Sequence, residues 1–416
     1  MKAFTEPLLS LAGFEEMTKT AEKSSGLISV TGCIDAQKSQ MIYAFGGHRK
    51  NKLIVTFGEQ KAKELYDEYS FFDKEVVYYP SKDVLFYQSD IRGNLLTAER
   101  IRALKAIREQ ESVTLVTTFD ALMNTMAPIE KMWENVLTLE QGQLLDLKEI
   151  QAALIRMGYE KEYQVQTMGQ FSVRGGILDV FPLTEENPIR IELWGDEIDT
   201  IRYFDCESQK SIENTDRVSI YPAAELVLSD EEKAGGIDKL KAEAKRVSDK
   251  LRKQMKTEEA HRVTVMADEL TEEWGELSMY AGMDAFLSYF FDERVGLLDY
   301  FNPSDSLIFF DELTRCAEQG KLTETEFSES MKQRLAMGYI LPGQMNSLFT
   351  EKEIVAKLGK YSCIALAALD NKANGLHQLG SYGIHCQSVS PYNNSFELLI
   401  KDLKRYKEKR LQSHSF

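Results

Sequence analysis

The chain has 416 residues, more than one hydrophobic core usually holds, so we expect two or three domains. Hydrophobic residues make up 43% and charged residues 28%, a balance that excludes global disorder. The formal net charge of −16 argues against a chain that grips DNA along its length and favours a protein partner.

The five cysteines are scattered singly and lack the short spacing of a zinc site or a redox pair. This pattern predicts reduced thiols and no metal. The first residues are amphipathic and include acidic groups, unlike a signal peptide. No stretch approaches the roughly 20 apolar residues that a membrane span requires. We therefore expect a cytoplasmic protein without membrane contact.

The first 118 residues alternate short apolar runs with stretches of helical spacing, which is typical of βαβ units around a parallel sheet. The pattern predicts strands over 26–31, 52–57, 76–79 and 112–117, and helices over 35–45, 60–70 and 97–110. This segment is therefore expected to form the first part of an α/β domain.

Between residues 119 and 213 the pattern changes to closely spaced strands with turn residues between them. The pattern predicts a helix over 146–157 and strands over 163–168, 176–181, 189–193 and 200–205. Consecutive strands with short turns favour an antiparallel sheet, so we expect a separate small α+β domain here.

Residues 214–392 are expected to return to the α/β domain, which makes 119–213 an insertion within it. The heavily charged stretch 229–275 predicts a solvent-exposed helix or helical hairpin, and further strands are expected over 306–310, 361–367 and 383–389. Residues 393–416 contain a basic amphipathic helix over about 396–410, either the end of the fold or the start of a further domain.

The strand over 26–31 is followed by GCIDAQKS, from Gly32 to Ser39. A phosphate-binding P-loop has a glycine, four residues, a second glycine, and then Lys and Ser or Thr. Gly32, Lys38 and Ser39 are in register, but Gln37 replaces the second glycine, and its side chain would crowd the phosphate. Asp35 adds a negative charge where the ligand is negative. We interpret the loop as a degenerate nucleotide site.

Asp311 and Glu312 directly follow the strand over 306–310, as the acidic pair of a Walker B strand does when it holds Mg²⁺ and positions water. The pair is a weak signal alone. Together with the damaged P-loop, it indicates a helicase-like ATPase ancestry. No arginine-finger motif of a second helicase lobe is recognisable after residue 390. We therefore expect no catalytic residues and no cofactor in this chain.

The most specific stretch is 169–210, which reads GQFSVRGGILDVFPLTEENPIRIELWGDEIDTIRYFDCESQK. It resembles the pattern G-x-F-x-x-R-G-x-x-x-D-x-F-P followed by R-I-E-aromatic-x-D-E-I-x-x-I-x-x-F-D, which UvrB shares with the transcription-repair coupling factors. The resemblance is closer to the amino-terminal, UvrB-like region of the coupling factors. The P-loop is degraded, whereas UvrB keeps an intact one. The third strand leads into residues 80–100 without room for the DNA-binding hairpin of UvrB. Asp311 and Glu312 are followed by Leu313, where UvrB has Ser. The resemblance covers essentially the whole chain and is weakest over 230–300.

The resemblance implies that the small domain binds UvrA, the damage-recognition ATPase of excision repair. The family's binding residues correspond here to Arg174, Arg190 and Trp194. Arginine and tryptophan are also frequent among the residues that dominate protein interfaces. The alternative is that Arg174 only satisfies carbonyl groups at a turn and that Trp194 is a core residue. Asp179 is expected to belong to the scaffold.

The function that the resemblance implies is recruitment of UvrA to a lesion where RNA polymerase has stalled, with the α/β domain as a nucleotide-free scaffold. A complete coupling factor binds RNA polymerase and DNA through regions absent here, so we expect an amino-terminal fragment or a truncated form. In that factor the module is expected to mask its UvrA surface until the motor moves. Two alternatives stay open: an ATP-dependent, UvrB-type DNA-loading protein, and a structural or autoinhibitory module.

Overall fold

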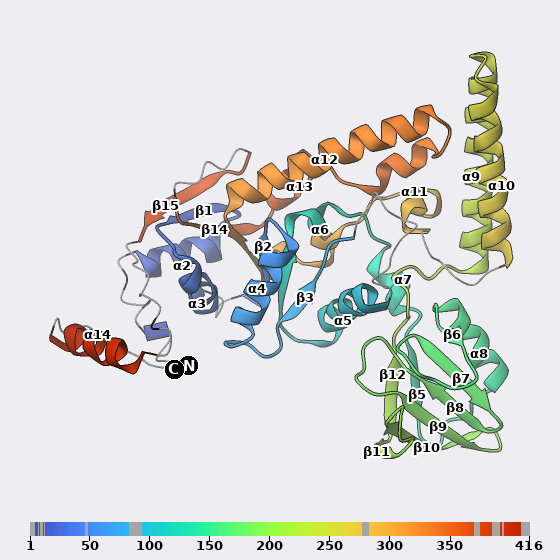
Figure 1. The fold of residues 1–416 in the computed structure, drawn as a ribbon, viewed down its shortest axis with the longest axis horizontal. Helices are drawn as coiled ribbons and strands as arrows, with labels where there is room; N and C mark the ends of the chain where they lie inside the picture. The colour runs from blue at the N-terminus through green and yellow to red at the C-terminus, as the bar shows by residue number, and fades with distance from the viewer. Residues whose placement is uncertain are drawn as a thin grey trace.

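The fold is seen in a computed structural model of the whole chain (Figure 1). The residues that it describes are 5, 6, 8, 11, 13–45, 49–82, 94–276, 283–369, 375–384, 392 and 395–408.

A seven-stranded parallel sheet forms the centre of the molecule, with the strand order β15-β1-β14-β13-β2-β4-β3. In chain order its strands are β1 (Gly26–Thr31), β2 (Asn51–Thr56), β3 (Val77–Tyr79), β4 (Val113–Thr118), β13 (Ser306–Asp311), β14 (Ser362–Ala367) and β15 (Gln378–Gly383). Strands from both ends of the chain therefore share one sheet, which confirms the α/β fold class with an antiparallel insertion.

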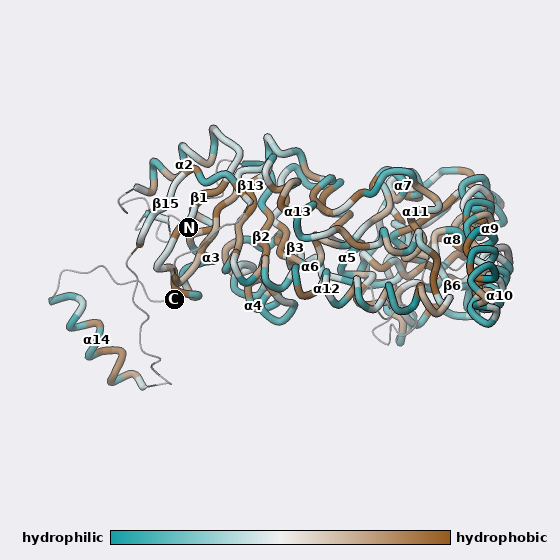
Figure 2. Tube along the Cα trace, turned by 90° about the horizontal axis from the view of Figure 1, so that it is seen from above, coloured by the Kyte–Doolittle hydropathy of each residue, from teal (hydrophilic) through white to brown (hydrophobic). Residues whose placement is uncertain are grey.

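Helices cover both faces of this sheet, and the strands between them are among the most hydrophobic segments in Figure 2. One face packs against α2 (Phe14–Lys23), α3 (Asp35–Phe45) and α4 (Glu59–Tyr69), and the other against α5 (Asn94–Glu109), α6 (Phe119–Met123), α12 (Leu313–Ala336) and α13 (Glu351–Leu358). Alternate residues of a strand point to opposite faces, so Phe309 and Phe310 enter different cores. Buried on both sides, the strands are continuously apolar.

The small domain contains a six-stranded sheet with the order β11-β10-β9-β8-β7-β6, antiparallel except for the pairing of β6 with β7. Its strands are β6 (Glu160–Lys161), β7 (Gln170–Arg174), β8 (Ile177–Val180), β9 (Ile189–Trp194), β10 (Glu197–Phe204) and β11 (Ser211–Thr215). One face packs on α8 (Leu147–Arg156) and on the two-stranded sheet of β5 (Leu137–Glu140) and β12 (Arg217–Ile220). The domain boundaries at 118/119 and 213/214 stay predictions.

One predicted strand is wrong, and another lies mostly outside the described residues. Residues 163–168 form a loop, because the side-chain oxygen of Gln170 accepts the backbone N–H groups of Gln166 and Thr167 that a strand would give to a neighbour. Of the strand expected over 383–389, residue 383 is the last of β15, which pairs with β1, and residue 384 is not in a strand. Its expected later part, 385–389, lies outside the described residues.

The predicted helical hairpin is confirmed as α9 (Asp230–Lys253) and α10 (Thr257–Glu276), which project together from the body of the protein (Figure 1). Ser229 and Glu232 form a capping box at the start of α9. At the base, Gly236 lies against the ring of Phe290, where a Cβ atom would come within 2.1 Å of ring carbon.

The predicted carboxyl-terminal helix is present as α14 (Phe396–Glu408). None of the described helices is both long and apolar enough to cross a membrane.

A buried ionic cluster joins α5 to the segment that follows the small domain. The Arg100 guanidinium donates to both carboxylate oxygens of Glu225, at 2.7 and 3.0 Å, and lies 4.1 Å from the ring centre of Tyr79. The Lys82 ammonium group pairs with the same carboxylate at 2.9 Å. Burial alone would raise the pKa of Glu225, but attraction to these two cations outweighs it and lowers the pKa to about 2.

This lowered pKa predicts how the cluster responds to acid. Because the folded-state pKa of Glu225 lies below its ordinary value of 4.5, its stabilising effect is present above pH 4.5 and is lost as the pH falls towards 2. We expect Glu225→Gln to lower the free energy of unfolding at pH 7 by roughly 3 kcal/mol. Urea unfolding of both proteins from pH 7 to pH 3 should show this difference shrinking; a constant difference would contradict the prediction.

Candidate functional site

The degenerate P-loop begins where β1 ends, and its first glycine is required by the backbone. Gly32 has a φ of +80°, and a Cβ atom there would lie 2.0 Å from the carbonyl oxygen of Ile384. Ile384 follows β15 and donates its backbone N–H to Thr31. The close approach of these two segments therefore accounts for Gly32 without a phosphate.

The loop itself is shortened by the helix that follows it. In a P-loop the backbone N–H groups between the two glycine positions, here 32 and 37, cradle the phosphates. Helix α3 already begins at Asp35, which places Asp35, Ala36 and Gln37 in its first turn. The Gln37 N–H donates to the carbonyl oxygen of Ile34 at 3.0 Å, and its side-chain oxygen is buried without a hydrogen-bond partner. The segment therefore lacks the open hollow that a phosphate needs.

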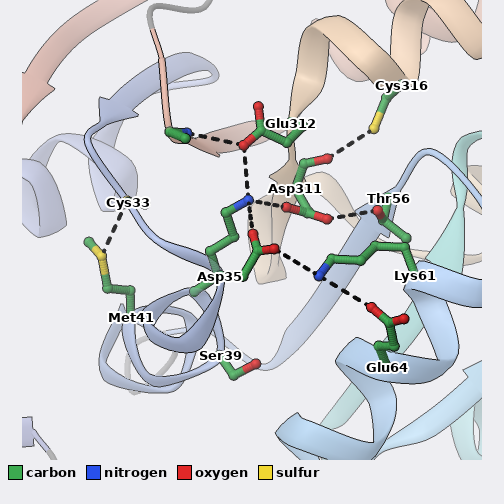
Figure 3. Close-up of polar contacts among 12 residues, drawn as sticks. Cys33, Asp35, Ser39, Met41, Thr56, Lys61, Glu64, Asp311, Glu312 and Cys316 are labelled. Atoms are coloured by element: carbon green, nitrogen blue, oxygen red, sulfur yellow. Dashed lines mark hydrogen bonds and ion pairs between the residues drawn. The ribbon is translucent and has the colours of Figure 1, made fainter. Parts of the chain in front are cut away.

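The Lys38 ammonium group is held by three carboxylates, those of Asp35, Asp311 and Glu312, which are labelled in Figure 3. It lies 2.5 Å from Asp311 Oδ1, 3.0 Å from Glu312 Oε1 and 2.9 Å from Asp35 Oδ1. The Lys38 and Asp311 side chains are each 1% exposed. Burial disfavours the charged form of Lys38, but the attraction of Asp311 and its neighbours outweighs this and raises the Lys38 pKa. The cation that would bind a phosphate is thus neutralised within the protein.

Further hydrogen bonds fix the two acidic groups. The Thr56 hydroxyl, at the end of β2, donates to Asp311 Oδ2 at 2.9 Å, and the backbone N–H of Ala368 donates to Glu312 Oε1 at 3.0 Å. Glu312 adopts a left-handed backbone conformation with a φ of 58°. This conformation costs a non-glycine residue about 1–2 kcal/mol, which the contacts of the carboxylate offset. Both members of the acidic pair are therefore engaged within the chain.

The remaining P-loop residue also has a partner inside the protein. The Ser39 hydroxyl, which would coordinate Mg²⁺ in an active P-loop, donates to Glu68 on α4 at 3.2 Å. Lys61, on the same helix, pairs with Asp35 at 3.3 Å. Within the described part of the chain, no group of three or more His, Cys, Asp or Glu side chains is arranged to hold a metal ion. The structure thus places Lys38, Asp311 and Glu312 in one ionic cluster, with Gly32, Gln37 and Ser39 in the adjoining loop and helix α3.

The second candidate site is the outer face of the six-stranded sheet. Its strand register places Asp179 on β8 opposite Arg190 on β9, and Arg190 opposite Arg202 on β10. Directly paired residues point to the same face of a sheet. The isoleucines that flank Arg190 point to the opposite face and are buried in the core of the small domain. One face is therefore apolar and packed, and the other carries the charged residues.

Asp179 is the centre of this polar face. Arg190 donates to its carboxylate from Nε at 2.7 Å and from Nη2 at 2.8 Å, and Arg174 Nη2 donates at 3.0 Å. The Asp179 side chain is only 2% exposed and that of Arg190 is 12% exposed. Arg190 also donates to Gln209 at 2.8 Å, and its guanidinium lies 4.3 Å from the Phe204 ring centre. Asp179 is thus the scaffold residue that orients both arginines.

Trp194 stands apart from this network, at the end of β9. It is 84% exposed, and Gly195, with a φ of +66°, makes the turn into β10 directly after it. Trp194 is therefore not a core residue. Arg174 pairs with a carboxylate and not with turn carbonyls, and its guanidinium lies 6.0 Å from the ring centre of the exposed Tyr163. The alternative structural roles given to Arg174 and Trp194 are contradicted.

The sequence prediction missed other members of the face. Arg202 makes two hydrogen bonds with the Glu192 carboxylate, and Thr200 donates to Glu192 at 3.1 Å. Glu192 lies midway between Arg190 and Trp194 on β9. Because alternate residues of a strand share a face, the sequence could have placed Glu192 on this face. Arg202 could be found only from the pairing of β9 with β10.

Comparison with known proteins agrees with this architecture. Residues 137–226 match the family described as the UvrB interaction domain. The chain is 29% identical over 306 residues to the transcription-repair-coupling factor of Bacillus subtilis, an alignment that covers 73% of this chain and 26% of that protein. It is 26% identical over 389 residues to that of Staphylococcus haemolyticus, covering 91% and 32%, and 26% identical over 406 residues to that of Staphylococcus aureus (strain MRSA252), covering 94% and 33%.

The chain thus spans between a quarter and a third of the length of these relatives. The matched family lies on the small domain that carries the Asp179 network, and the longer alignments extend over both sheets. The chain contains a UvrB interaction domain and is homologous over most of its length to the amino-terminal third of transcription-repair-coupling factors.

Proposed function

We propose that this chain is a non-catalytic module that recruits UvrA through Arg174, Arg190 and Trp194. The observation that carries the proposal is the combination of an 84% exposed tryptophan with arginines that a buried carboxylate holds in place. A large aromatic side chain kept in water has no packing role, and preorganised arginines lose little entropy on binding a carboxylate partner. Interfaces are commonly dominated by such aromatic and arginine residues.

The absence of catalysis is part of the same proposal. The Lys38 ammonium group is shared among three carboxylates, and helix α3 occupies the position of the phosphate cradle. Nucleotide binding would require these ion pairs to break and the buried acids to face a polyphosphate. The α/β domain therefore serves as a rigid scaffold. In a coupling factor, this module would link UvrA to the RNA polymerase and DNA bound by the rest of the protein.

Replacement of Trp194 tests the proposal directly. We expect Trp194→Ala to weaken UvrA binding by about 2 kcal/mol, roughly thirtyfold in Kd, because the side chain would be central to the interface. Biolayer interferometry with purified UvrA measures this change. The variant should keep the wild-type melting temperature, because Trp194 is exposed.

Phe71→Ala is the matched control, since Phe71 is an exposed aromatic residue outside the small domain. It should leave UvrA affinity within about twofold of the wild-type value. Unchanged affinity in Trp194→Ala, or equal weakening in both variants, would show that the polar face of the small domain is not the UvrA site.

A further inference from the structure

The turn of the α9–α10 hairpin is strongly basic although the chain as a whole is acidic. Residues 245–256 contain six Lys or Arg residues and one acidic residue, in a protein with a net charge of −16. We call this segment the basic tip. The six basic residues are all exposed and are Lys245, Arg246, Lys250, Arg252, Lys253 and Lys256.

The helix geometry gathers these charges on the outer side of the tip. Arg246, Lys250 and Lys253 are spaced i, i+4 and i+7, which places them along one face of α9. The opposite face is buried against α10, through residues such as Leu251 and Ser248, whose hydroxyl donates to the carbonyl oxygen of Ala260 at 3.1 Å. The cationic stripe therefore cannot turn inward and faces solvent.

The tip cations are compensated only by exposed or long contacts, and the acidic residues Glu258 and Glu259 lie beside the tip in the first turn of α10. Arg246 pairs with the partly buried Glu243 at 3.6 Å, and the exposed Arg252 and Asp249 pair at 3.7 Å, both long contacts. Among the residues that the structure describes, Lys250 and Lys253 form no ion pair. Contacts of this kind contribute about 0–1 kcal/mol, so the positive charge of the tip remains available to a ligand.

The tip also lies at the far end of a rigid rod. A 24-residue helix is about 36 Å long, and Figure 1 shows the turn between α9 and α10 at the end remote from the small domain. The α10 side is braced against the end of α12, because Arg262 donates to the Tyr339 hydroxyl at 3.0 Å and its guanidinium lies 4.9 Å from that ring centre. The basic stripe is thus displayed at a fixed position and distance.

We propose that the basic tip binds the sugar-phosphate backbone of duplex DNA. Lysine, which predominates at the tip, is depleted in the cores of protein interfaces but serves well as a point charge for phosphates. The tip also lacks the apolar cluster that a protein partner needs. Its one large exposed apolar residue is Met255, which is 88% exposed at the turn. The acidic remainder of the chain repels DNA, so contact is confined to the tip.

Fluorescence anisotropy with a labelled 20-base-pair duplex and the full chain tests this proposal. With three to five phosphate contacts, affinity should fall about fifty- to five-hundredfold between 50 and 200 mM NaCl. The double variant Lys250→Glu and Lys253→Glu should weaken binding at 50 mM NaCl by about tenfold or more and reduce the slope of log K against log salt by about 2.

The matched control is Lys148→Glu with Lys352→Glu, two exposed lysines on α8 and α13 that give the same change in net charge. It should bind within about twofold of wild type. Equal weakening in both variants, or no binding at 50 mM NaCl, would overturn the proposal. The proposal would also be overturned if sedimentation showed that the tip binds only an acidic protein or a second copy of the chain. The UvrA affinity of the tip variant is measured in parallel. Unchanged UvrA binding with lost DNA binding would show that the tip acts independently of the proposed UvrA site.

Discussion

Lys38→Met is expected to lower the free energy of unfolding by about 3–5 kcal/mol, because it leaves the buried Asp311 carboxylate without its cation. Methionine approximates the volume of the lysine stem, so lost packing contributes little. Urea denaturation followed by circular dichroism measures the change. ATP binding by calorimetry should show no saturable signal in either protein, because the Lys38 charge already serves an internal role.

The double variant Lys38→Met with Asp311→Asn is the control that identifies the cause. When both members of a buried ion pair are replaced, the desolvation penalty disappears along with the attraction, so most of the lost stability should return. A double variant as unstable as Lys38→Met would show that the lysine acts through packing. Micromolar ATP binding that Lys38→Met abolishes would instead mean that the ionic cluster opens for nucleotide.

Arg190→Ala should destabilise the small domain by about 3–5 kcal/mol, because Arg190 is the main partner of the buried Asp179 carboxylate. Differential scanning calorimetry of the full chain should show a lower transition for this domain. Weaker UvrA binding by Arg190→Ala could therefore come from a lost contact or from unfolding of the small domain. Weaker binding by Trp194→Ala reports the lost contact alone.

Arg174→Ala is the comparison variant for this effect. Arg174 donates a single hydrogen bond to Asp179 and is more exposed, so its removal should cost about 1 kcal/mol or less. If Arg190→Ala melted at the same temperature as Arg174→Ala, Asp179 would not depend on Arg190 for its charge compensation. UvrA affinity of Arg174→Ala then measures an arginine contact without a large folding cost.

The sequence predicted most of the fold because its buried strands are continuous apolar runs. The strands around Leu27, Leu53, Leu115 and Ile308 were found within a residue or so of their observed bounds. The errors fell where side-chain hydrogen bonds or a distant pairing decide the structure. The loop over 163–168 depends on the Gln170 side chain, and the position of β15 depends on its register with β1.

The candidate sites were predictable as sets of residues but not as geometry. Lys38 follows β1 and Asp311 ends β13 in one parallel sheet, so their proximity could be expected from the pattern. The start of α3 at residue 35 was also predicted, but the pairing of Asp35 with Lys38 within its first turn was not. Similarly, the burial of Asp179 appears only when the cross-strand pairing with Arg190 is known.

The strand order has a consequence for how the protein is made. Strand β1 pairs only with β14 and β15 among the described strands, and β13 separates β14 from β2. At a synthesis rate of about 5–20 residues per second, β1 waits roughly 20–70 s on the ribosome before its neighbours emerge. The small domain, contiguous in sequence, can fold during this interval. Chaperones that shield apolar strands should therefore bind the nascent amino-terminal segment, and release should coincide with the synthesis of β14.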